Sequence, residues 1–455
     1  MPTDSIRLGQ RLRAALSFKQ ERKVRRSGRR RYLNNLILHF RPTTVPEATL
    51  RLTLSWGLGG MAAVLILTQL VTGGLLNFVY EPIPSRAYAS VLTLHNAVAF
   101  GKLVRNLHHW GANLLVIVVG LHMLRVVFTA AFYPPRHLTW FAGLGLLALV
   151  LAANFTGYLL PYDQLAYWAV TICTGMLDYI PWLGAHIKAL IMADGEIGSA
   201  ALKLFYTIHT SLLPAVGVLL MAYHFWRVRK AGGLVRAPQA EHNGAAAPLR
   251  VGTVPHLIVR ELAMTAVVLA VLLVLAVLFD APLNAPANPG LSPNPTKAPW
   301  YFAGLQELLL HFPPVVAVTV IPCLAGLLLV VLPFAGSENA AGGVWFGNRS
   351  DRRWSTSAVM AGIVLAVLWV LLDEYARSHN GQPAGAGLPV GGGIVFFLWG
   401  AGLVGFYGFL GRQKCVSRHG AVQAVMALLM GAFAVLTLVG VAFRGPGMRL
   451  IWFGG

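Results

Sequence analysis

Nine long apolar stretches constrain the fold of this 455-residue chain more than any other feature of its sequence. Each is of spanning or near-spanning length, since a helix needs about 20 apolar residues to cross a bilayer. Only 11% of the residues are charged, and nearly all of these lie between the stretches. The sequence therefore predicts an all-α, polytopic transmembrane helix bundle of about eight or nine helices. The stretches are 55–79, 97–128, 138–160, 204–226, 257–278, 315–334, 357–372, 390–410 and 421–443.

The segments between the stretches divide their charges unequally between two sides. Thirteen of the 36 Lys and Arg residues precede the first stretch, and further groups lie at 227–260, 349–353 and 412–418. If the N-terminus is cytoplasmic, all these groups fall on the cytoplasmic side, as the positive-inside rule requires. We therefore expect a multi-pass protein of a bacterial inner membrane whose basic arm contacts anionic lipid headgroups. The same distribution argues against a nucleic-acid partner, despite the formal net charge of +20.

Two pairs of histidines lie within the second and fourth stretches. His108 and His122 are 14 residues apart, and His209 and His224 are 15 apart. Both spacings are close to four helical turns, so each pair lies along one helix face, with its members roughly 21 Å apart. When the two helices lie side by side, His108 meets His209 near the outer side, and His122 meets His224 near the inner side. This frame predicts two haems b with bis-histidine ligation. No CxxCH motif is present, so we expect non-covalent haems.

Arginines and glycines accompany the histidines at matching positions. Arg105 precedes His108 by three residues, and Arg125 follows His122 by three, where each can neutralise a haem propionate. Two glycine pairs in the first and third stretches repeat the 14-residue spacing, namely Gly59 with Gly73 and Gly143 with Gly157. Glycine often marks close approach by something large, and two macrocycles at these depths explain both pairs. The alternative is ordinary packing by small residues, with histidines that satisfy hydrogen bonds between helices.

Composition also suggests how the chain is divided. Two outer-side segments, 161–203 and 280–314, are long and rich in Pro, Gly and aromatic residues, and such loops often form the walls of a binding site. The predicted parts are a basic cytoplasmic arm at 1–54 with a candidate interfacial helix at 32–40, a di-haem four-helix domain at 55–231 and an inner-side linker at 232–256. A C-terminal domain at 257–335, with the fifth and sixth stretches and their outer segment, and additional transmembrane helices at 336–455 follow.

At these residues the sequence resembles a known family, the cytochrome b subunit of quinol–cytochrome c oxidoreductase (bc) complexes. The resemblance extends at least from the first to the sixth stretch. The 15-residue spacing of the second histidine pair resembles the plastoquinol-oxidising and related bacterial branch, in which the protein is often split after the fourth helix. Here both parts look fused. The matching segments are 58–60 (LGG), 105–110 (RNLHHW), 121–125 (LHMLR), 136–140 (RHLTW), 156–164 (TGYLLPYDQ), 167–170 (YWAV) and 205–210 (FYTIHT).

The resemblance implies a quinol-oxidising pocket on the outer side, beside the His108/His209 haem. Its walls would include Tyr162 and Asp163 from the first long loop and Trp300 and Tyr301 from the second. In the family, quinol gives one electron to a Rieske iron–sulfur protein and the other to the outer haem. The second electron reaches quinone at the inner side, which stores redox energy as a proton gradient. The implied partners are a Rieske protein and a c-type cytochrome, in a homodimeric complex.

Some residues depart from the family pattern. The family's quinol site carries a Pro-Glu-Trp-Tyr stretch whose Glu accepts a proton, but here Ala298 and Pro299 precede Trp300 and Tyr301. Glu307, two helical turns further, is the predicted substitute; the alternative is a solvated loop residue. The plastoquinol branch has a haem-attaching cysteine where this chain has glycine at position 57, which excludes that bond. The ninth stretch also exceeds the usual eight helices.

Two other classes of function share some of these features. A di-haem b membrane anchor, which shuttles electrons between a dehydrogenase or hydrogenase and the quinone pool, shares the histidine frame but does not need the two long loops. A transporter without haem requires discontinuous helices or internal repeats. Haem content separates the transporter from the other two classes, and dependence on a Rieske partner separates the bc-type cytochrome from the anchor.

Overall fold

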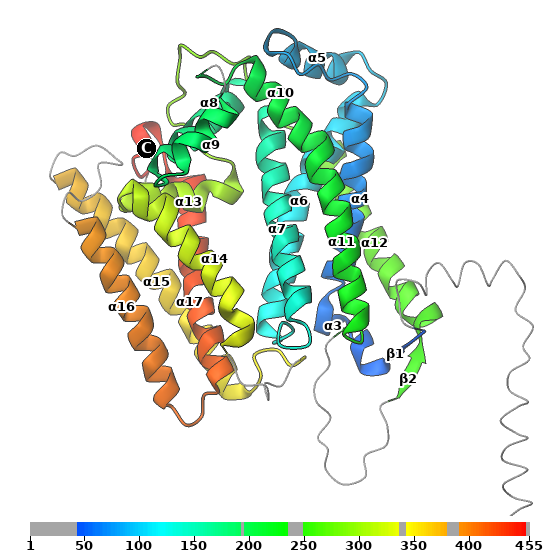
Figure 1. Cartoon of the computed structure of the whole chain (residues 1–455), viewed down its shortest axis with the longest axis vertical. Helices are drawn as coiled ribbons and strands as arrows, with labels where there is room; N and C mark the ends of the chain where they lie inside the picture. Colours follow the sequence, from blue (N-terminus) through cyan, green and yellow to red (C-terminus); the bar gives the residue numbers. More distant parts are fainter. Residues whose placement is uncertain (1–42, 193–194, 235–248, 336–342, 380–390, 452–455) are drawn as a thin grey trace, which may run out of the picture.

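The computed structural model describes residues 43–192, 195–234, 249–335, 343–379 and 391–451. The candidate interfacial helix at 32–40, most of the basic arm and most of the inner-side linker lie outside these residues. Within them the protein is almost entirely helical (Figure 1). Nine helices of this described part are long and apolar enough to cross a membrane. The predicted all-α membrane bundle is therefore confirmed.

The first four spans form one bundle, in the centre and right of Figure 1. They are α4 (Leu58–Leu76), α6 (Gly101–Phe128), α7 (His137–Leu159) and a continuous helix made of α10 (Ser199–Thr207), a π turn (Ile208–Leu212) and α11 (Leu213–Lys230). The fifth span, α12 (Thr253–Leu278), packs along α4 and α6, where its Leu272 joins a core with Leu65 and Leu115. The short strands β1 (Thr44–Pro46) and β2 (Arg250–Gly252) pair antiparallel at the start of α12.

The remaining spans form a second group, on the left of Figure 1. They are a π turn (Val316–Val320) continued by α14 (Ile321–Val331), then α15 (Arg349–His379), α16 (Gly391–Arg412), and α17 (Arg418–Leu438), which ends in a π turn (Val439–Phe443). Two glycines let α15 and α17 approach closely: a Cβ at Gly362 would lie 2.1 Å from the Leu428 carbonyl oxygen, and one at Gly431 2.4 Å from that of Val359. The ninth span, α17, is thus tightly packed within this group.

Shorter helices occupy the ends of the spans. At the lower end in Figure 1 α3 (Leu52–Ser55) precedes α4, and at the upper end lie α5 (Pro84–Asn96), α8 (Gln164–Met176), α9 (Gly184–Ile191) and α13 (Trp300–His311). The outer-side segments 161–203 and 280–314 are therefore partly helical rather than irregular loops. Some of their apolar residues are buried, as Tyr167 and Val170 of α8 are, but the helices are too short to span a membrane.

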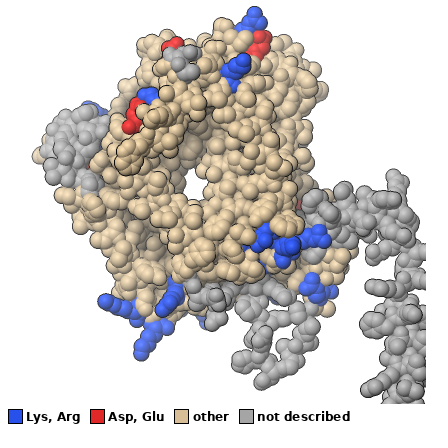
Figure 2. Space-filling model, viewed as in Figure 1, with Lys and Arg blue, Asp and Glu red and all other residues tan. Residues whose placement is uncertain are grey.

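The two groups of spans meet at both ends and leave an opening between them, visible near the centre of Figure 2. At the upper end the Phe302 ring of α13 lies 6.0 Å from the Phe155 ring of α7. At the lower end the Trp140 indole donates to the Leu329 carbonyl oxygen at 2.8 Å. Lys and Arg gather at the lower end, whereas the Asp and Glu in view lie near the upper end (Figure 2).

Candidate functional site

The first histidine pair meets at the upper level, near the end of the bundle that carries α5 and α8 (Figure 1). The ring centroids of His108, from α6, and His209, from the π turn before α11, lie 6.1 Å apart, with an interplanar angle of 81°. A metal ion between two imidazoles, with metal–nitrogen bonds of about 2 Å, sets the ring centres roughly 6 Å apart. The spacing of this pair therefore fits two axial ligands of one iron.

Threonine hydroxyls fix the protonation of both rings. Thr72 Oγ1 lies 2.9 Å from His108 Nδ1, and Thr156 Oγ1 lies 3.2 Å from His209 Nδ1. Each hydroxyl donates its own proton to a carbonyl oxygen one turn back in its helix, at 2.7 and 2.8 Å. The hydroxyls must then accept from the histidines, so Nδ1 of each ring carries the proton. Nε2 is left with its lone pair, which is the form that binds a metal.

Replacing either threonine with valine is expected to weaken haem binding at the upper level by roughly 10- to 100-fold, the usual cost of losing a group that orients a ligand histidine. Valine keeps the shape of threonine and removes only the hydroxyl. Haem content and reductive titration of Thr72→Val and Thr156→Val measure the effect. Thr68→Val is the matched control, because the Thr68 hydroxyl donates only to its own helix, at 2.9 Å to the Val64 carbonyl oxygen. Unchanged haem binding in the first two variants would contradict this role.

Glycines on α4 and α7 make room for the upper rings. A Cβ added at Gly73 would lie 3.1 Å from Cε1 of His108, and one at Gly157 only 2.5 Å from Cε1 of His209. No side chain fits at Gly157 while the ring stays in place. Each of these glycines directly follows the threonine that holds its histidine, so Thr-Gly is a sequence signal for the two threonines that sequence reasoning missed.

The lower level repeats the glycine arrangement around His122 and His224. A Cβ at Gly59 would lie 3.3 Å from Cε1 of His122, and one at Gly143 3.4 Å from Cε1 of His224. The structure thus brings each of the four predicted glycines against the histidine of its own level. The upper rings depend most on the missing Cβ, whereas the lower rings have more room.

Two guanidinium groups at the lower level have buried N–H donors that lack a hydrogen-bond partner among the described residues. Arg125 and Arg227 each follow a histidine of this level by three residues. Nε of Arg125 donates to the Leu54 carbonyl oxygen at 2.9 Å. Its Nη2 and the Nε of Arg227 are buried without a hydrogen-bond partner among the described residues. Buried donors are rarely left unsatisfied, and a haem propionate supplies the acceptor oxygens that they need. The lower level therefore fits a haem.

Arg105, the arginine of the upper level, has partners within the protein. It donates to the carbonyl oxygens of Ala281 and Pro282, at 2.8 and 2.6 Å, and also lines the cavity at this level. Arg105 thus joins α6 to the segment after α12. Its contact with a propionate stays a prediction.

A π turn explains why the second histidine pair is spaced by 15 residues instead of 14. His209 lies in the turn Ile208–Leu212, just before Pro214, whose ring nitrogen cannot donate a helical hydrogen bond. A π turn accommodates one extra residue without displacing the helix on either side. His209 and His224 therefore share a face as His108 and His122 do. The odd spacing and the proline are the sequence signal for this turn.

A cavity of about 870 Å³ lies beside the upper histidine pair. This volume is within the usual range for a small-molecule site, roughly 300–1,000 Å³. The lining comes from the bundle, the two outer-side segments and the start of α13, and among the predicted site residues it includes His108, His209, Gly73, Gly157, Arg105, Asp163, Trp300 and Tyr301. The structure therefore brings the upper ligands and most of the predicted quinol-site residues to one cavity.

Tyr162 and Asp163 hold the two outer-side segments together. Asp163 Oδ1 accepts from the Ala166 amide at 2.8 Å and so caps α8, while Oδ2 accepts from the backbone and side-chain nitrogens of Asn284 at 2.9 and 3.1 Å. The Tyr162 carbonyl oxygen accepts from the Ala287 amide at 3.2 Å, and its hydroxyl donates to Ile197 O at 2.6 Å. The bonds to Asn284 and Ala287 join the two segments, which together form one wall of the cavity.

Trp300 and Tyr301 begin α13 at the opposite wall. The Trp300 indole donates to Asn113 Oδ1 of α6 at 2.6 Å, which ties α13 to the bundle. Burial raises the pKa of Tyr301, with Tyr158 and Cys173 adding to the effect. Its phenol is therefore neutral at physiological pH and able to donate a hydrogen bond.

Glu307 is a buried helical residue, not the solvated loop residue of the alternative interpretation. It lies on α13 with 0% exposure, but it is not among the residues that line the cavity. Although burial alone raises the pKa of Glu307, hydrogen bonds and charges from His311 and Arg444 lower it below its usual value. A carboxylate held ionised in this way is a poor proton acceptor. The position of Glu307 therefore argues against the role predicted for it.

Comparison with known proteins agrees with this arrangement. The family model described as cytochrome b/b6/petB matches residues 45–232. Cytochrome b6 of Heliomicrobium gestii is 41% identical over 188 residues, which cover 41% of this chain and 87% of that protein. Cytochrome b6 of Heliobacterium mobile is 43% identical over the same shares, and that of Cyanidium caldarium 40% identical over 38% of this chain and 81% of its own length.

The similarity in fold extends beyond the matched segment. A chain of the solved structure named "Hyperthermophilic respiratory Complex III" superimposes with a TM-score of 0.65 and covers 93% of this chain and 98% of its own, at 21% identity. At that identity the likeness shows the fold alone. The N-terminal match, however, covers most of each cytochrome b6. The chain therefore belongs to the cytochrome b/b6 family of membrane electron-transport proteins.

Proposed function

We propose that this protein is the cytochrome b of a bc-type quinol–cytochrome c oxidoreductase and that it works only within that complex. Quinol would be oxidised in the cavity at the upper level, and quinone would be reduced at the lower end. The observation that carries the proposal is the 870 Å³ cavity, which touches the upper histidine pair on one side and Trp300 and Tyr301 on the other. A substrate there lies between an electron acceptor and a hydrogen-bonding wall.

The proposed cofactors are two haems b, held by His108 with His209 and by His122 with His224. When bound, these haems carry single electrons between the two levels. The protein's part is to hold the histidines in the metal-binding form, to exclude water from the bundle and to keep the two levels roughly 21 Å apart along the helices.

The cavity residues would divide the work of binding quinol. Tyr301, a neutral phenol at the wall, would donate a hydrogen bond to a quinol oxygen. Burial raises the pKa of Tyr162 to about 12, and its hydroxyl already bonds to Ile197 O at 2.6 Å. Tyr162 does not line the cavity and would act by holding the segments that do. Asp163 joins the two segments, and Trp300 fixes the start of α13. Glu307 would contribute by holding α13 rather than by accepting the proton.

The proposed orientation places the upper end outside. Charged residues at that end include the ion pairs of Arg86 with Glu81 at 3.0 Å and of Lys188 with Asp178 at 2.5 Å, while Lys and Arg gather at the lower end (Figure 2). The positive-inside rule then assigns the lower end and the N-terminus to the cytoplasm of a bacterial inner membrane. A Rieske protein and a c-type cytochrome would dock at the upper end of a homodimeric complex.

A di-haem membrane anchor remains the second candidate. It shares the two histidine levels but gives no reason for a cavity that two joined segments and α13 enclose. The two candidates differ in their partners: only the bc-type cytochrome needs a Rieske protein to oxidise quinol.

The spectrum of the purified protein tests the proposal. A dithionite-reduced minus oxidised difference spectrum with pyridine haemochrome quantification is expected to give about two haems b per chain, titrating at separate potentials. Well-folded protein without haem would overturn the proposal and favour the transporter. Two haems with quinol oxidation that does not depend on a Rieske protein would favour the anchor.

A further inference from the structure

The last turn of the ninth span and the residues after it contact the wall of the upper cavity. Residues 439–451 comprise the π turn Val439–Phe443, then Arg444, then a turn around Pro446–Met448. The segment closes on itself, because the Ile451 amide donates to the Phe443 carbonyl oxygen at 2.8 Å and the Gly445 amide to that of Arg449 at 2.9 Å. It is therefore a compact structural unit.

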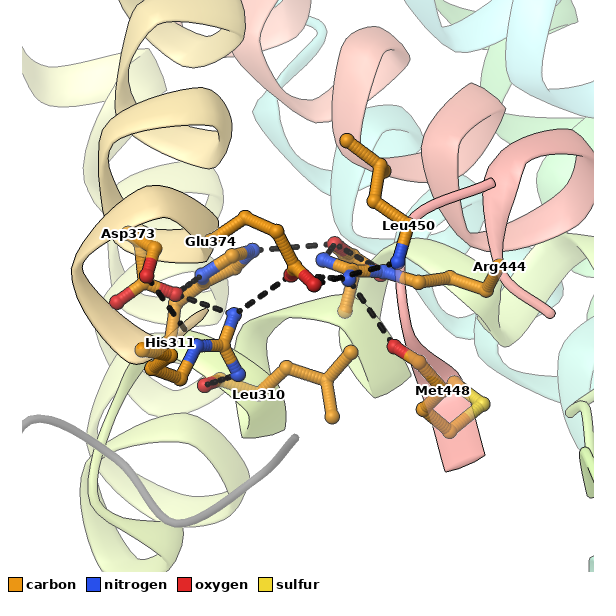
Figure 3. Close-up of polar contacts among 9 residues, drawn as sticks. Leu310, His311, Asp373, Glu374, Arg444, Met448 and Leu450 are labelled. Carbon is orange, nitrogen blue, oxygen red and sulfur yellow. Dashed lines mark hydrogen bonds and ion pairs between the residues drawn. The ribbon is translucent and has the colours of Figure 1, made fainter. Parts of the chain in front are cut away.

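Arg444 attaches this segment to two helices. The residue is 1% exposed. Its Nε donates to both carboxylate oxygens of Glu307 at 3.1 Å, its Nη2 also contacts Glu307, and its Nη1 donates to Glu374 Oε2 at 2.8 Å and to Met448 O at 3.0 Å (Figure 3). Glu307 belongs to α13 and Glu374 to α15. One guanidinium thus joins the 439–451 segment, α13 and α15.

The surrounding charges are balanced within the protein. His311 lies 3.0 Å from Glu307 Oε1 through Nε2 and 2.5 Å from Asp373 Oδ2 through Nδ1 (Figure 3). Carboxylates only accept, so both ring nitrogens donate and His311 is an imidazolium. Arg377 also pairs with Asp373 at 2.5 Å.

With Glu374, this cluster has three carboxylates against His311, Arg377 and Arg444. Buried charges persist when they are paired in this way. Only Asp373 Oδ1 lacks a partner among the described residues, and the balance of charge favours a structural effect on the neighbours of the cluster over a binding site.

The same segment holds the cavity wall directly. Lys297, which lines the cavity, donates from Nζ to the Val441 carbonyl oxygen at 3.0 Å. Asn294 Oδ1 accepts from the Gly447 amide at 2.5 Å. The π turn Val439–Phe443 lies against α13, where a Cβ at Gly440 would come within 2.8 Å of the Ala303 carbonyl oxygen. Residues 439–451 thus hold the cavity-lining residues 297–301, Asn294 just before them, and the helix α13.

We propose that residues 439–451 brace the wall of the upper cavity and that Arg444 is a positioning residue for quinol. By fixing Glu307 it sets the place of α13, and so of Trp300 and Tyr301. This inference rests on the proposed quinol site, and it gives the ninth span a role: α17 carries the brace to the upper end. Without Arg444, the buried carboxylate of Glu307 and the partly exposed carboxylate of Glu374 lose their shared partner, and α13 is expected to move.

The test compares Arg444→Met and Arg444→Lys with the unaltered protein, each purified in its complex with haems bound. Since a displacement of about 1 Å can cost on the order of 100-fold in rate, Arg444→Met is expected to lower kcat/KM for a short-chain quinol by about 10- to 100-fold, mainly through KM. Haem content and both midpoint potentials stay unchanged. Arg444→Lys restores part of the loss, because it keeps the charge. Arg449→Met, an exposed arginine of the same segment, is the matched control.

Hydrogen–deuterium exchange of residues 291–301 gives a readout that does not depend on quinol chemistry. Protection there is expected to fall in Arg444→Met and to stay unchanged in Arg449→Met. If the unaltered protein oxidises no quinol but exchange responds in this way, the proposed function fails and the brace stands. Unchanged exchange with unchanged kcat/KM overturns the brace, and faster exchange with unchanged kcat/KM overturns the positioning role.

A milder variant covers the case in which Arg444→Met does not fold. Asn294 is exposed, so Asn294→Ala removes a wall contact without disturbing the buried cluster. Asn294→Ala is expected to raise KM for the short-chain quinol several-fold, as Arg444→Lys does, while the haem potentials stay unchanged. An unchanged KM in both variants would overturn the proposal.

Discussion

Replacing His224 with leucine is expected to remove the lower haem and to leave the upper haem in place, so that haem content falls from about two to about one per chain. The two levels are roughly 21 Å apart along their helices, and the threonines that hold the upper histidines belong to that level alone. His122→Leu removes the other histidine of the lower pair and is expected to give the same result. Reduced-minus-oxidised spectra and redox titration measure it.

The control for these variants is a buried histidine outside the two pairs. His419 is 5% exposed and bonds to the Tyr133 hydroxyl at 2.9 Å, away from the four ligand positions. His419→Gln is expected to keep both haems. Equal loss of both haems from folded His224→Leu protein would count against the pairing of His122 with His224.

Adding a single methyl group at Gly157 is expected to abolish most haem binding at the upper level. The new Cβ would lie 2.5 Å from Cε1 of His209, and the ring cannot retreat easily, since its Nδ1 is held by Thr156 at 3.2 Å and by the Ala153 carbonyl oxygen at 3.0 Å. Overpacking of this kind costs about 1–3 kcal/mol, to which the loss of ligand orientation adds. Haem content and the redox titration of Gly157→Ala separate this level from the lower one.

Other glycines provide a graded comparison. Gly143→Ala meets His224 at an ordinary contact distance of 3.4 Å and should lose little haem. Gly74→Ala, with no atom within 4 Å, should lose none. If Gly157→Ala bound haem as tightly as Gly74→Ala, the position of the His209 ring described above would be wrong.

Local sequence patterns were sufficient for the helices and for the histidine frame. Each span was predictable because membrane insertion acts on the composition of one continuous stretch, without reference to the rest of the chain. The facing of His108 and His209 followed from helical periodicity and from the similar depths of the two histidines in their spans. The role of the glycines was predictable for the same reason. Their spacing of 14 residues on α4 and α7 equals that of His108 and His122 on α6, and this match can be seen in the sequence alone.

Glu307 shows where such reasoning stops. Its distance of two turns from Trp300 made it the natural substitute for the missing Glu, but its partner Arg444 lies 137 residues further along the chain. The helical content of 161–203 and 280–314 was also not evident, because runs this short depend on tertiary packing for their stability.

The sequence by itself determined a bundle of nine apolar spans, two histidine levels and the family resemblance, because these depend on periodicity and composition within single segments. Only the tertiary structure decided that a π turn brings His209 into line, that threonines fix the tautomer of the upper histidines, and that Arg444 binds Glu307. Those features depend on backbone geometry and on contacts between distant segments. Electrostatic pairs buried in the interior form only where the packed helices bring the charges together.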